Sequence, residues 1–154
     1  MRTALRDSGF TLVELVTTII LIAILSVVVL PRLMTSSSYS AFTLRDEFIS
    51  ELRKAQLMAM NNRDRCYRVD VNADGYQLVR FDNSTCTGTR ISEPKQAFTG
   101  GASLELISTG NSAFDVSFDT SGISSLACSG PCINVIADET LTINIESQGY
   151  IHGR

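Results

Sequence analysis

Residues 9–31 of the chain read GFTLVELVTTIILIAILSVVVLP, and this stretch decides how the rest of the fold is organised. Residues 10–30 form a run of 21 residues with a single charged side chain, that of Glu14. An α-helix of that length extends about 31 Å, which matches the hydrocarbon core of a bilayer. We therefore predict a membrane-spanning helix over residues 10–30.

The residues before this run, MRTALRDSG, set its orientation. They carry Arg2 and Arg6, and basic residues beside a membrane span stay on the cytoplasmic side. The chain after residue 30 is then exported, so we expect a single-pass inner-membrane protein with a periplasmic C-terminal domain. A conventional secretory signal fits poorly, because the small residues Ser8 and Gly9 precede the apolar run instead of following it.

Glu14 is unusual inside such a segment. A carboxylate in hydrocarbon costs about 2.5 to 3.5 kcal/mol even on permissive insertion scales, so it should have a partner. The span contains no Lys or Arg within helical reach of Glu14. We therefore expect the partner to be a group on another chain.

Residues 9–14, GFTLVE, resemble the prepilin signature of type IV pilins and type II secretion pseudopilins. The resemblance implies that a prepilin peptidase cuts between Gly9 and Phe10, and that Phe10 is then N-methylated. Glu14 becomes the fifth residue of the mature chain and Pro31 the twenty-second, and typical members carry these residues there.

In that family, the glutamate is thought to pair with the new terminal amine of a neighbouring subunit. The resemblance thus implies that Glu14 and Pro31 serve assembly. The implied partners are the peptidase, the major and other minor pilins, the inner-membrane assembly platform and, before assembly, the membrane. Pro31 lacks an amide hydrogen and should bend or loosen the helix around it.

The second helical segment is predicted at residues 41–61, where the apolar residues repeat with helical spacing. Its apolar side chains fall within about 80° of one another around the helix, and charged residues lie opposite. We expect this stripe to pack on a sheet rather than on a membrane, because the polar face mixes acidic and basic residues. The stripe consists of Ala41, Leu44, Phe48, Leu52, Ala55 and Ala59.

Beyond residue 65 the apolar residues alternate, which indicates strands. The segments 66–71 and 76–81 flank NADG and predict a hairpin with a tight turn. We predict an α+β fold, type IV pilin-like, with a long N-terminal helix packed on an antiparallel β-sheet domain. Its parts are a leader (1–9), a transmembrane and polymerisation helix (10–30), the amphipathic half of the helix (31–62) and a periplasmic domain (63–154). Further strands are expected at 103–107, 113–118, 132–137, 141–145 and 149–153, with a turn at 119–122.

The junction ISELRKAQLMAMNNRDRCYRVDV (residues 49–71) resembles that of GspH/FimT-like pilins, as do FDTSG near residue 120 and the closing INIESQGYI. Taken together, TLVELVTTIILIAILSVVVLPRL (residues 11–33) and MNNRDRCYRV (residues 60–69) resemble, within that group, the minor pilins of the mannose-sensitive haemagglutinin (MSHA) pilus, the MshC type. The resemblance implies a minor pilin or pseudopilin that joins or initiates a filament used for surface attachment.

Four cysteines, Cys66, Cys86, Cys128 and Cys132, follow the span. An even number in an oxidising compartment indicates two disulfides, and four cysteines allow three pairings. We predict Cys66–Cys86 and Cys128–Cys132. The alternatives are a zinc site, which lacks paired C-x-x-C motifs, and a redox pair at 128 and 132, whose three intervening residues are one too many.

Other chemistry has little support. Residues 70–75, DVNADG, mimic the start of an EF-hand loop, but position twelve is Phe81 instead of glutamate, so a hairpin turn is favoured. The only histidine, His152, is near the C-terminus and offers no catalytic arrangement. We expect neither an enzyme nor a cofactor nor a metal site.

Two rival functions share these features. A FimT-like pilin that captures DNA would use Arg63, Arg65, Arg68 and Arg154. Against it, the chain without residues 1–9 carries 11 basic and 15 acidic residues, so nucleic acid is a poor partner. A type II secretion pseudopilin is the other rival, and the sequence features found here do not separate it from a pilin.

Overall fold

The computed structural model describes residues 10–33 and 37–154, and the side chains of residues 10–26 and 41–154. The chain divides into two compact units, one ending at Thr35 and the other beginning at Ser36. The leader, residues 1–9, and with it Gly9, lies outside the described residues. Each unit is considered by itself.

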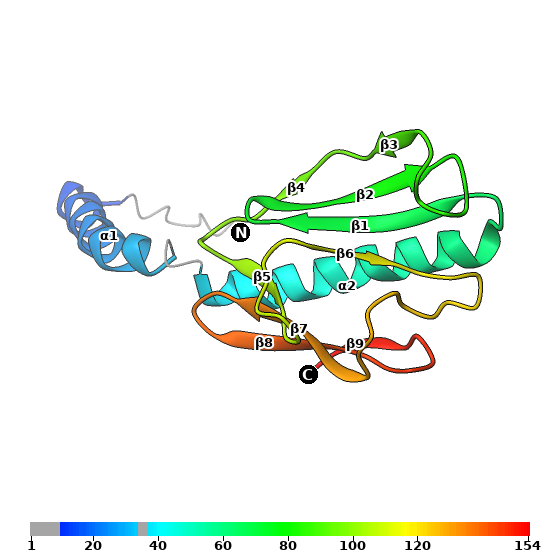
Figure 1. Ribbon diagram of the computed structural model, residues 1–154. Helices are drawn as coiled ribbons and strands as arrows, with labels where there is room; N and C mark the ends of the chain where they lie inside the picture. Colours follow the sequence, from blue (N-terminus) through cyan, green and yellow to red (C-terminus); the bar gives the residue numbers. More distant parts are fainter. Residues whose placement is uncertain (1–9, 34–36) are drawn as a thin grey trace, which may run out of the picture. The chain divides into compact units, whose positions relative to one another are not determined.

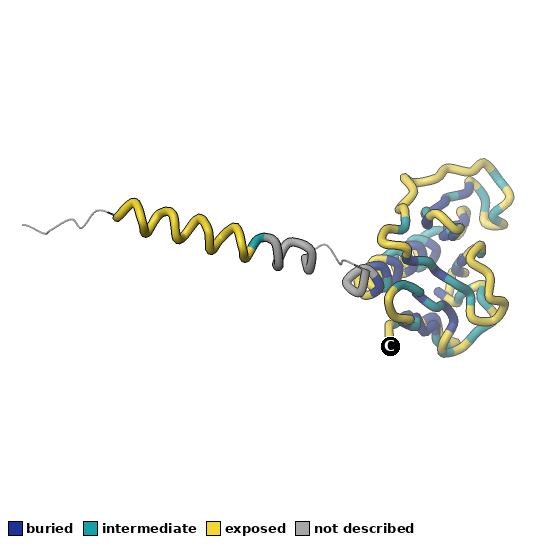
Figure 2. The backbone as a smooth tube through the Cα atoms, turned by 90° about the vertical axis from the view of Figure 1, so that its left-hand side faces the viewer, coloured by how far each residue is buried: buried dark blue, intermediate teal, exposed yellow. Residues whose placement is uncertain are grey.

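The first unit is the helix α1 (Leu12–Leu33), which includes Pro31 near its end. Every described residue of α1 up to residue 25 is exposed, as the yellow tube in Figure 2 shows, and the apolar residues are distributed around the whole helix. Among the described residues, no helix combines the length and apolar character needed to cross a membrane. The predicted span of residues 10–30 extends past the described side chains of α1 and is not confirmed.

The second unit is organised around the helix α2 (Ser37–Asn61). The helix contacts β1 and β6 of one sheet and β7, β8 and β9 of another. The buried residues of the unit lie along this helix and along the strands next to it (Figure 2). The apolar stripe predicted from the sequence is confirmed, since each of its members is at most 8% exposed. These are Ala41, Leu44, Phe48, Leu52, Ala55 and Ala59, joined by Ile49.

The first sheet is antiparallel, with strand order β3-β2-β1-β6 and with β4 also paired to β2 (Figure 1). Its inner face, which includes Val69, Val71 and Leu78, belongs to the same core as α2. The strands are β1 (Cys66–Asn72), β2 (Gly75–Phe81), β3 (Arg90–Ser92), β4 (Gln96–Ala97) and β6 (Phe114–Ser117).

The second sheet is also antiparallel, with strand order β5-β7-β8-β9. Leu104, Ile133 and Ile143 are fully buried and complete the core against α2. The strands are β5 (Ser103–Leu106), β7 (Gly130–Ile136), β8 (Thr140–Ile145) and β9 (Ile151–Gly153).

The hairpin predicted from NADG is confirmed. Asn72 pairs with Gly75, which leaves a two-residue turn between β1 and β2, and the Asn72 side chain accepts a hydrogen bond from the Asp74 amide (3.0 Å). A side chain at Gly75 would collide with the carbonyl of Gln96 in β4, so the close approach of β4 requires glycine there. The EF-hand-like residues 70–75 therefore form the turn of a β-hairpin and the strand ends next to it, as the sequence predicted.

The predicted strands 103–107, 113–118, 132–137, 141–145 and 149–153 each overlap a strand of the structure, although the ends differ. The sequence analysis missed β3 and β4. These strands have only three and two residues, and every one of them is exposed. No alternation of buried and exposed residues marks them, because they pair along the edge of β2 without contributing to the core.

Candidate functional site

The N-terminal motif forms the start of α1. The Glu14 amide donates a hydrogen bond to Thr11 Oγ1 (3.2 Å), and the Leu15 amide donates one to the Thr11 carbonyl (3.2 Å). Thr11 is thus the N-cap residue, and Glu14, three residues on, has the capping-box spacing. The cap uses residues that all follow Gly9, so cleavage after Gly9 would leave this helix start complete.

Glu14 lies in the first turn of α1 and is exposed. A carboxylate there is stabilised by the positive end of the helix dipole. Among residues 10–26, the part of its own unit whose side chains the structure describes, there is no basic residue to pair with it. Phe10, directly before the cap, is 81% exposed. Both side chains are therefore available to another molecule.

The remaining residues predicted for processing and assembly are only partly described. Gly9 lies outside the described residues. Pro31 is part of α1, and its side chain lies outside the described portion. The roles of Gly9, Phe10, Glu14 and Pro31 stay predictions. The sequence analysis missed Thr11 as a helix cap, although a threonine followed three residues later by a glutamate is a recognisable signal.

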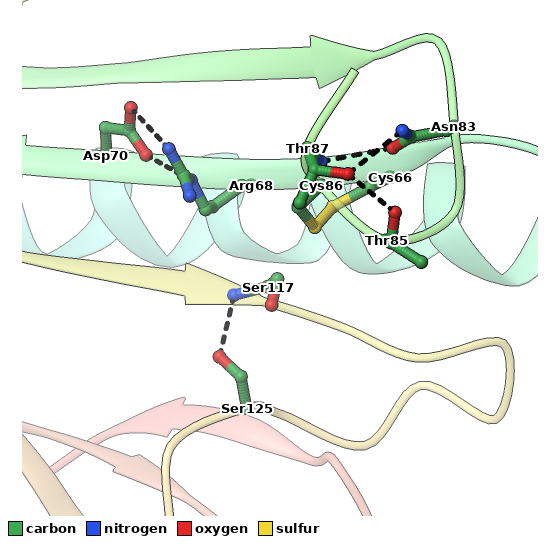
Figure 3. Close-up of a disulfide and its surroundings, with 9 residues drawn as sticks. All are labelled: Cys66, Arg68, Asp70, Asn83, Thr85, Cys86, Thr87, Ser117 and Ser125. Carbon is green, nitrogen blue, oxygen red and sulfur yellow. Dashed lines mark hydrogen bonds and ion pairs between the residues drawn. A yellow bond between two sulfur atoms is a disulfide. The ribbon is translucent and has the colours of Figure 1, made fainter.

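Both predicted disulfides are present. Cys66–Cys86 joins the start of β1 to the loop after β2, with the Cα atoms 5.1 Å apart (Figure 3). Cys128–Cys132 joins the chain just before β7 to a residue within that strand, with the Cα atoms 5.9 Å apart. Because all four sulfurs are in disulfides, none is a thiolate for the zinc site considered as an alternative.

The four arginines considered for DNA binding do not form one surface. The Arg68 guanidinium pairs with Asp70 (2.6 Å) and stacks over the ring of Phe81 (4.9 Å), as Figure 3 shows for the ion pair. The Arg154 carbonyl accepts a hydrogen bond from Arg45, in the first half of α2. Arg63 and Arg65 follow the other end of that helix.

Three ionisable side chains of the globular unit are perturbed. Burial raises the pKa of Tyr76 to about 12, helped by the nearby charges of Glu47 and Glu51. The hydrogen bond to Glu93 raises the pKa of Lys54, and a hydrogen bond from Thr89 lowers that of Asp82. These three groups support local structure and do not converge on a catalytic centre.

The chain matches a known family at its N-terminus. Residues 5–30 match the family described as the prokaryotic N-terminal methylation motif, which covers about a sixth of the chain. No curated protein and no solved structure matches the chain. The chain therefore carries the methylation motif of type IV pilin-like precursors, which implies processing as a pilin or pseudopilin.

The motif also implies what kind of protein this is. It implies processing by prepilin peptidase and assembly with the pilus machinery, and it points to membrane anchoring before assembly and to a structural protein. The second unit, a helix followed by antiparallel sheets, is compatible with a pilin-like α+β fold.

Proposed function

We propose that this protein is a minor pilin of a type IV pilus used for surface attachment, within the GspH/FimT-like group and its MSHA branch. The observation that carries the proposal is the methylation motif at residues 5–30. Its capped helix start, formed by residues 11–15, lies just after the predicted cleavage point. The assignment to the GspH/FimT-like group rests on the sequence resemblance of residues 49–71, and the assignment to the MSHA branch rests on that of residues 11–33 and 60–69.

In this proposal α1 is the polymerisation element. Its described apolar residues are exposed on all sides of the helix, and such a helix requires apolar surroundings on all sides. The bilayer supplies these surroundings before assembly, and a bundle of α1 helices supplies them in the filament. The helix is thus transferred from one apolar environment to another.

Cleavage between Gly9 and Phe10 creates an amine at Phe10, directly before the helix cap. The exposed carboxylate of Glu14 then pairs with the corresponding amine of a neighbouring copy. Such a contact forms only if the two helices have the correct axial register, so it specifies the position of each subunit.

The globular unit is the exported part and faces the surroundings of the filament. Its two disulfides are typical of an oxidising compartment such as the periplasm. A pilus role and a type II secretion role differ in what deletion of the gene abolishes. We expect deletion to reduce surface attachment and leave protein secretion unchanged, and the opposite pattern would contradict the assignment to a pilus.

The processing step is tested by replacing Gly9. We expect Gly9→Val to leave an uncleaved precursor in the membrane, because a branched side chain stands next to the scissile bond. Ala4→Val is the matched control, since it adds the same side chain to the leader away from that bond. Normal cleavage and piliation of Gly9→Val would contradict the proposal.

The assembly step is tested by replacing Glu14. Glu14→Gln removes the charge and keeps the shape, so insertion and cleavage should persist while the amount of filament falls. Thr17→Val is the matched control, because Thr17 lies one turn further along α1 and its hydroxyl bonds only the Glu14 carbonyl (3.0 Å). Wild-type levels of filament with Glu14→Gln would exclude the pairing with Phe10.

A further inference from the structure

An open pocket lies at the end of the globular unit where α2 ends and β1 begins. Its volume is about 450 Å³, within the range of pockets that bind small molecules. Its lining comes from three stretches that are far apart in the sequence: residues 59–66 from the end of α2 to the start of β1, residues 84–86 in the loop after β2, and residues 117–125 from the end of β6 onward. We call it the helix-end pocket.

Apolar groups form one part of the helix-end pocket. Ala59 is 3% exposed and Phe118 is 7% exposed, and the Cys66–Cys86 disulfide lies beside them. This surface offers no hydrogen-bonding side chain. It suits the apolar C–H face of a ligand ring rather than a charged group of the ligand.

Two arginines give the helix-end pocket its positive charge. Arg63 has no ion-pair partner within the described part of the chain. Arg65 approaches only Asp64, at 3.9 Å, and that carboxylate is 79% exposed. Their guanidinium groups are therefore free to bind a planar anion, and a carboxylate matches the geometry of the guanidinium fork.

Hydroxyl and amide groups supply further polar contacts in the pocket. Ser125 Oγ accepts a hydrogen bond from the Ser117 amide (3.0 Å, Figure 3), and Ser124 Oγ accepts one from the Leu126 amide (3.1 Å). These bonds hold the two oxygens in place, and each hydroxyl hydrogen stays available to donate. Asn62 uses its NH₂ group to bond the Met58 carbonyl (2.9 Å), which leaves its oxygen as an acceptor.

The loop on one side of the pocket is held in a fixed conformation. Asp119 Oδ1 accepts hydrogen bonds from the amides of Ser121 (2.9 Å) and Ile123 (2.8 Å). Gln56 Nε2 donates to the carbonyls of Gly122 and Gly149, at 2.7 Å each. The wall formed by the β2–β3 loop is braced by the disulfide and by the bond from the Thr87 amide to Asn83 (3.1 Å). Such a pocket loses little conformational entropy when it binds.

We propose that the helix-end pocket binds an acidic monosaccharide unit, such as a uronic acid at the end of a surface glycan. The arginines bind the carboxylate, the serines and Asn62 bond the ring hydroxyls, and Phe118 packs on the apolar face of the ring. A nucleic acid fits less well, because the chain has a net charge of −3 and the other arginines lie elsewhere. The site belongs to the globular unit and does not depend on filament assembly.

The test is a calorimetric titration of the full chain with glucuronate, in a polyoxyethylene detergent that contains neither sugar nor phosphate. We expect saturable binding that weakens as salt rises. Arg63→Gln and Arg65→Gln should each weaken it by about tenfold, the usual effect of losing a hydrogen bond to a charged group. Arg80→Gln, a surface change on β2 outside the pocket, should leave it unchanged.

Glucose and acetate separate the two halves of the proposal. Each carries only part of the ligand, so each should bind at least tenfold more weakly than glucuronate. Absence of saturable glucuronate binding to the full chain would overturn the proposal, and so would equal binding by Arg63→Gln, Arg65→Gln and wild type. If acetate bound as tightly as glucuronate, the pocket would be a general anion site and the sugar proposal would be wrong. If glucose bound as tightly as glucuronate, the arginines would not contribute to binding and the proposal would also be wrong. An unchanged melting temperature of each variant shows that folding is intact.

Discussion

The helices α1 and α2 are of similar length but differ in how far their apolar residues are buried. In α2, one stripe is buried against two sheets of its own unit, and charged residues face outward. In α1, the described apolar residues surround the helix and are all exposed. The core around α2 is thus complete within its own unit, whereas in the proposed function α1 finds its apolar surroundings in a membrane or in other copies.

The largest expected effect comes from Phe48, which is fully buried in α2 and packs edge-on to Tyr76 with ring centroids 5.0 Å apart. Phe48→Ala should lower the free energy of unfolding by about 3 to 5 kcal/mol, measured by urea denaturation. Phe42→Ala, at a site 46% exposed, is the matched control and should change it by less than about 1 kcal/mol. Equal effects at the two sites would contradict the burial of the α2 stripe.

Ile20 gives the corresponding test in α1, where the side chain is 53% exposed. Ile20→Ala should leave the unfolding of the globular unit unchanged, because the core cluster around α2 is formed by residues of the second unit. The same variant should lower the yield of filament. A loss of stability as large as that of Phe48→Ala would remove the contrast between the two helices.

The two disulfides should differ in their effect on stability. Cys66–Cys86 closes a loop with a sequence separation of 20, and Cys128–Cys132 one with a separation of 4. The chain-entropy model gives losses of about 3 and about 2 kcal/mol when each pair is replaced by serines. Thermal unfolding of the two double variants would show the order, and a larger loss for the shorter loop would contradict the entropic account.

Tyr76 predicts a dependence of stability on alkaline pH. Its pKa is raised to about 12 by burial, whereas a tyrosine in the unfolded chain titrates near about 10. The unfolded state therefore loses its proton first, so the stabilisation is complete below pH ~10 and is lost as pH rises toward ~12, by about 3 kcal/mol. Tyr76→Phe lacks this loss. If the free energies of unfolding of wild type and Tyr76→Phe changed in parallel between pH 9 and pH 12, the role of Tyr76 in this pH dependence would be contradicted.

The smallest expected effect is at the start of α1. Thr11→Val removes the oxygen that accepts the Glu14 amide, which costs about 1 kcal/mol of helix stability for a typical N-cap. Hydrogen exchange at Glu14 should then become faster, while exchange in α2 stays unchanged. Unaltered protection of the Glu14 amide would show that Thr11 is not the cap.

Much of the globular unit could be predicted from the sequence because its signals are periodic. The stripe from Ala41 to Ala59 repeats with helical spacing, and the hairpin around Gly75 combines alternation with a turn signal. The strands β3 and β4 carry no such signal, since all their residues are exposed. Residues such as Arg63, Ser84 and Ser125 come together only through the tertiary fold. No local sequence pattern therefore predicts the pocket that they line.

The N-terminal motif could be recognised in the sequence for the opposite reason, since its information is local. Gly9, Phe10 and Glu14 lie within six residues of sequence, and the family match covers all three. The capping role of Thr11 required the hydrogen bonds of the structure to identify it. The partner of Glu14 belongs to another molecule in this account, so neither the sequence nor a single chain can supply it.

The most direct test of the central claim is the intact mass of the protein isolated from the filament fraction of its native cells. The account predicts a chain that begins at Phe10, carries one added methyl group on its terminal amine, and retains both disulfides. A chain that keeps residues 1–9, or one that begins at a residue other than Phe10, would contradict it.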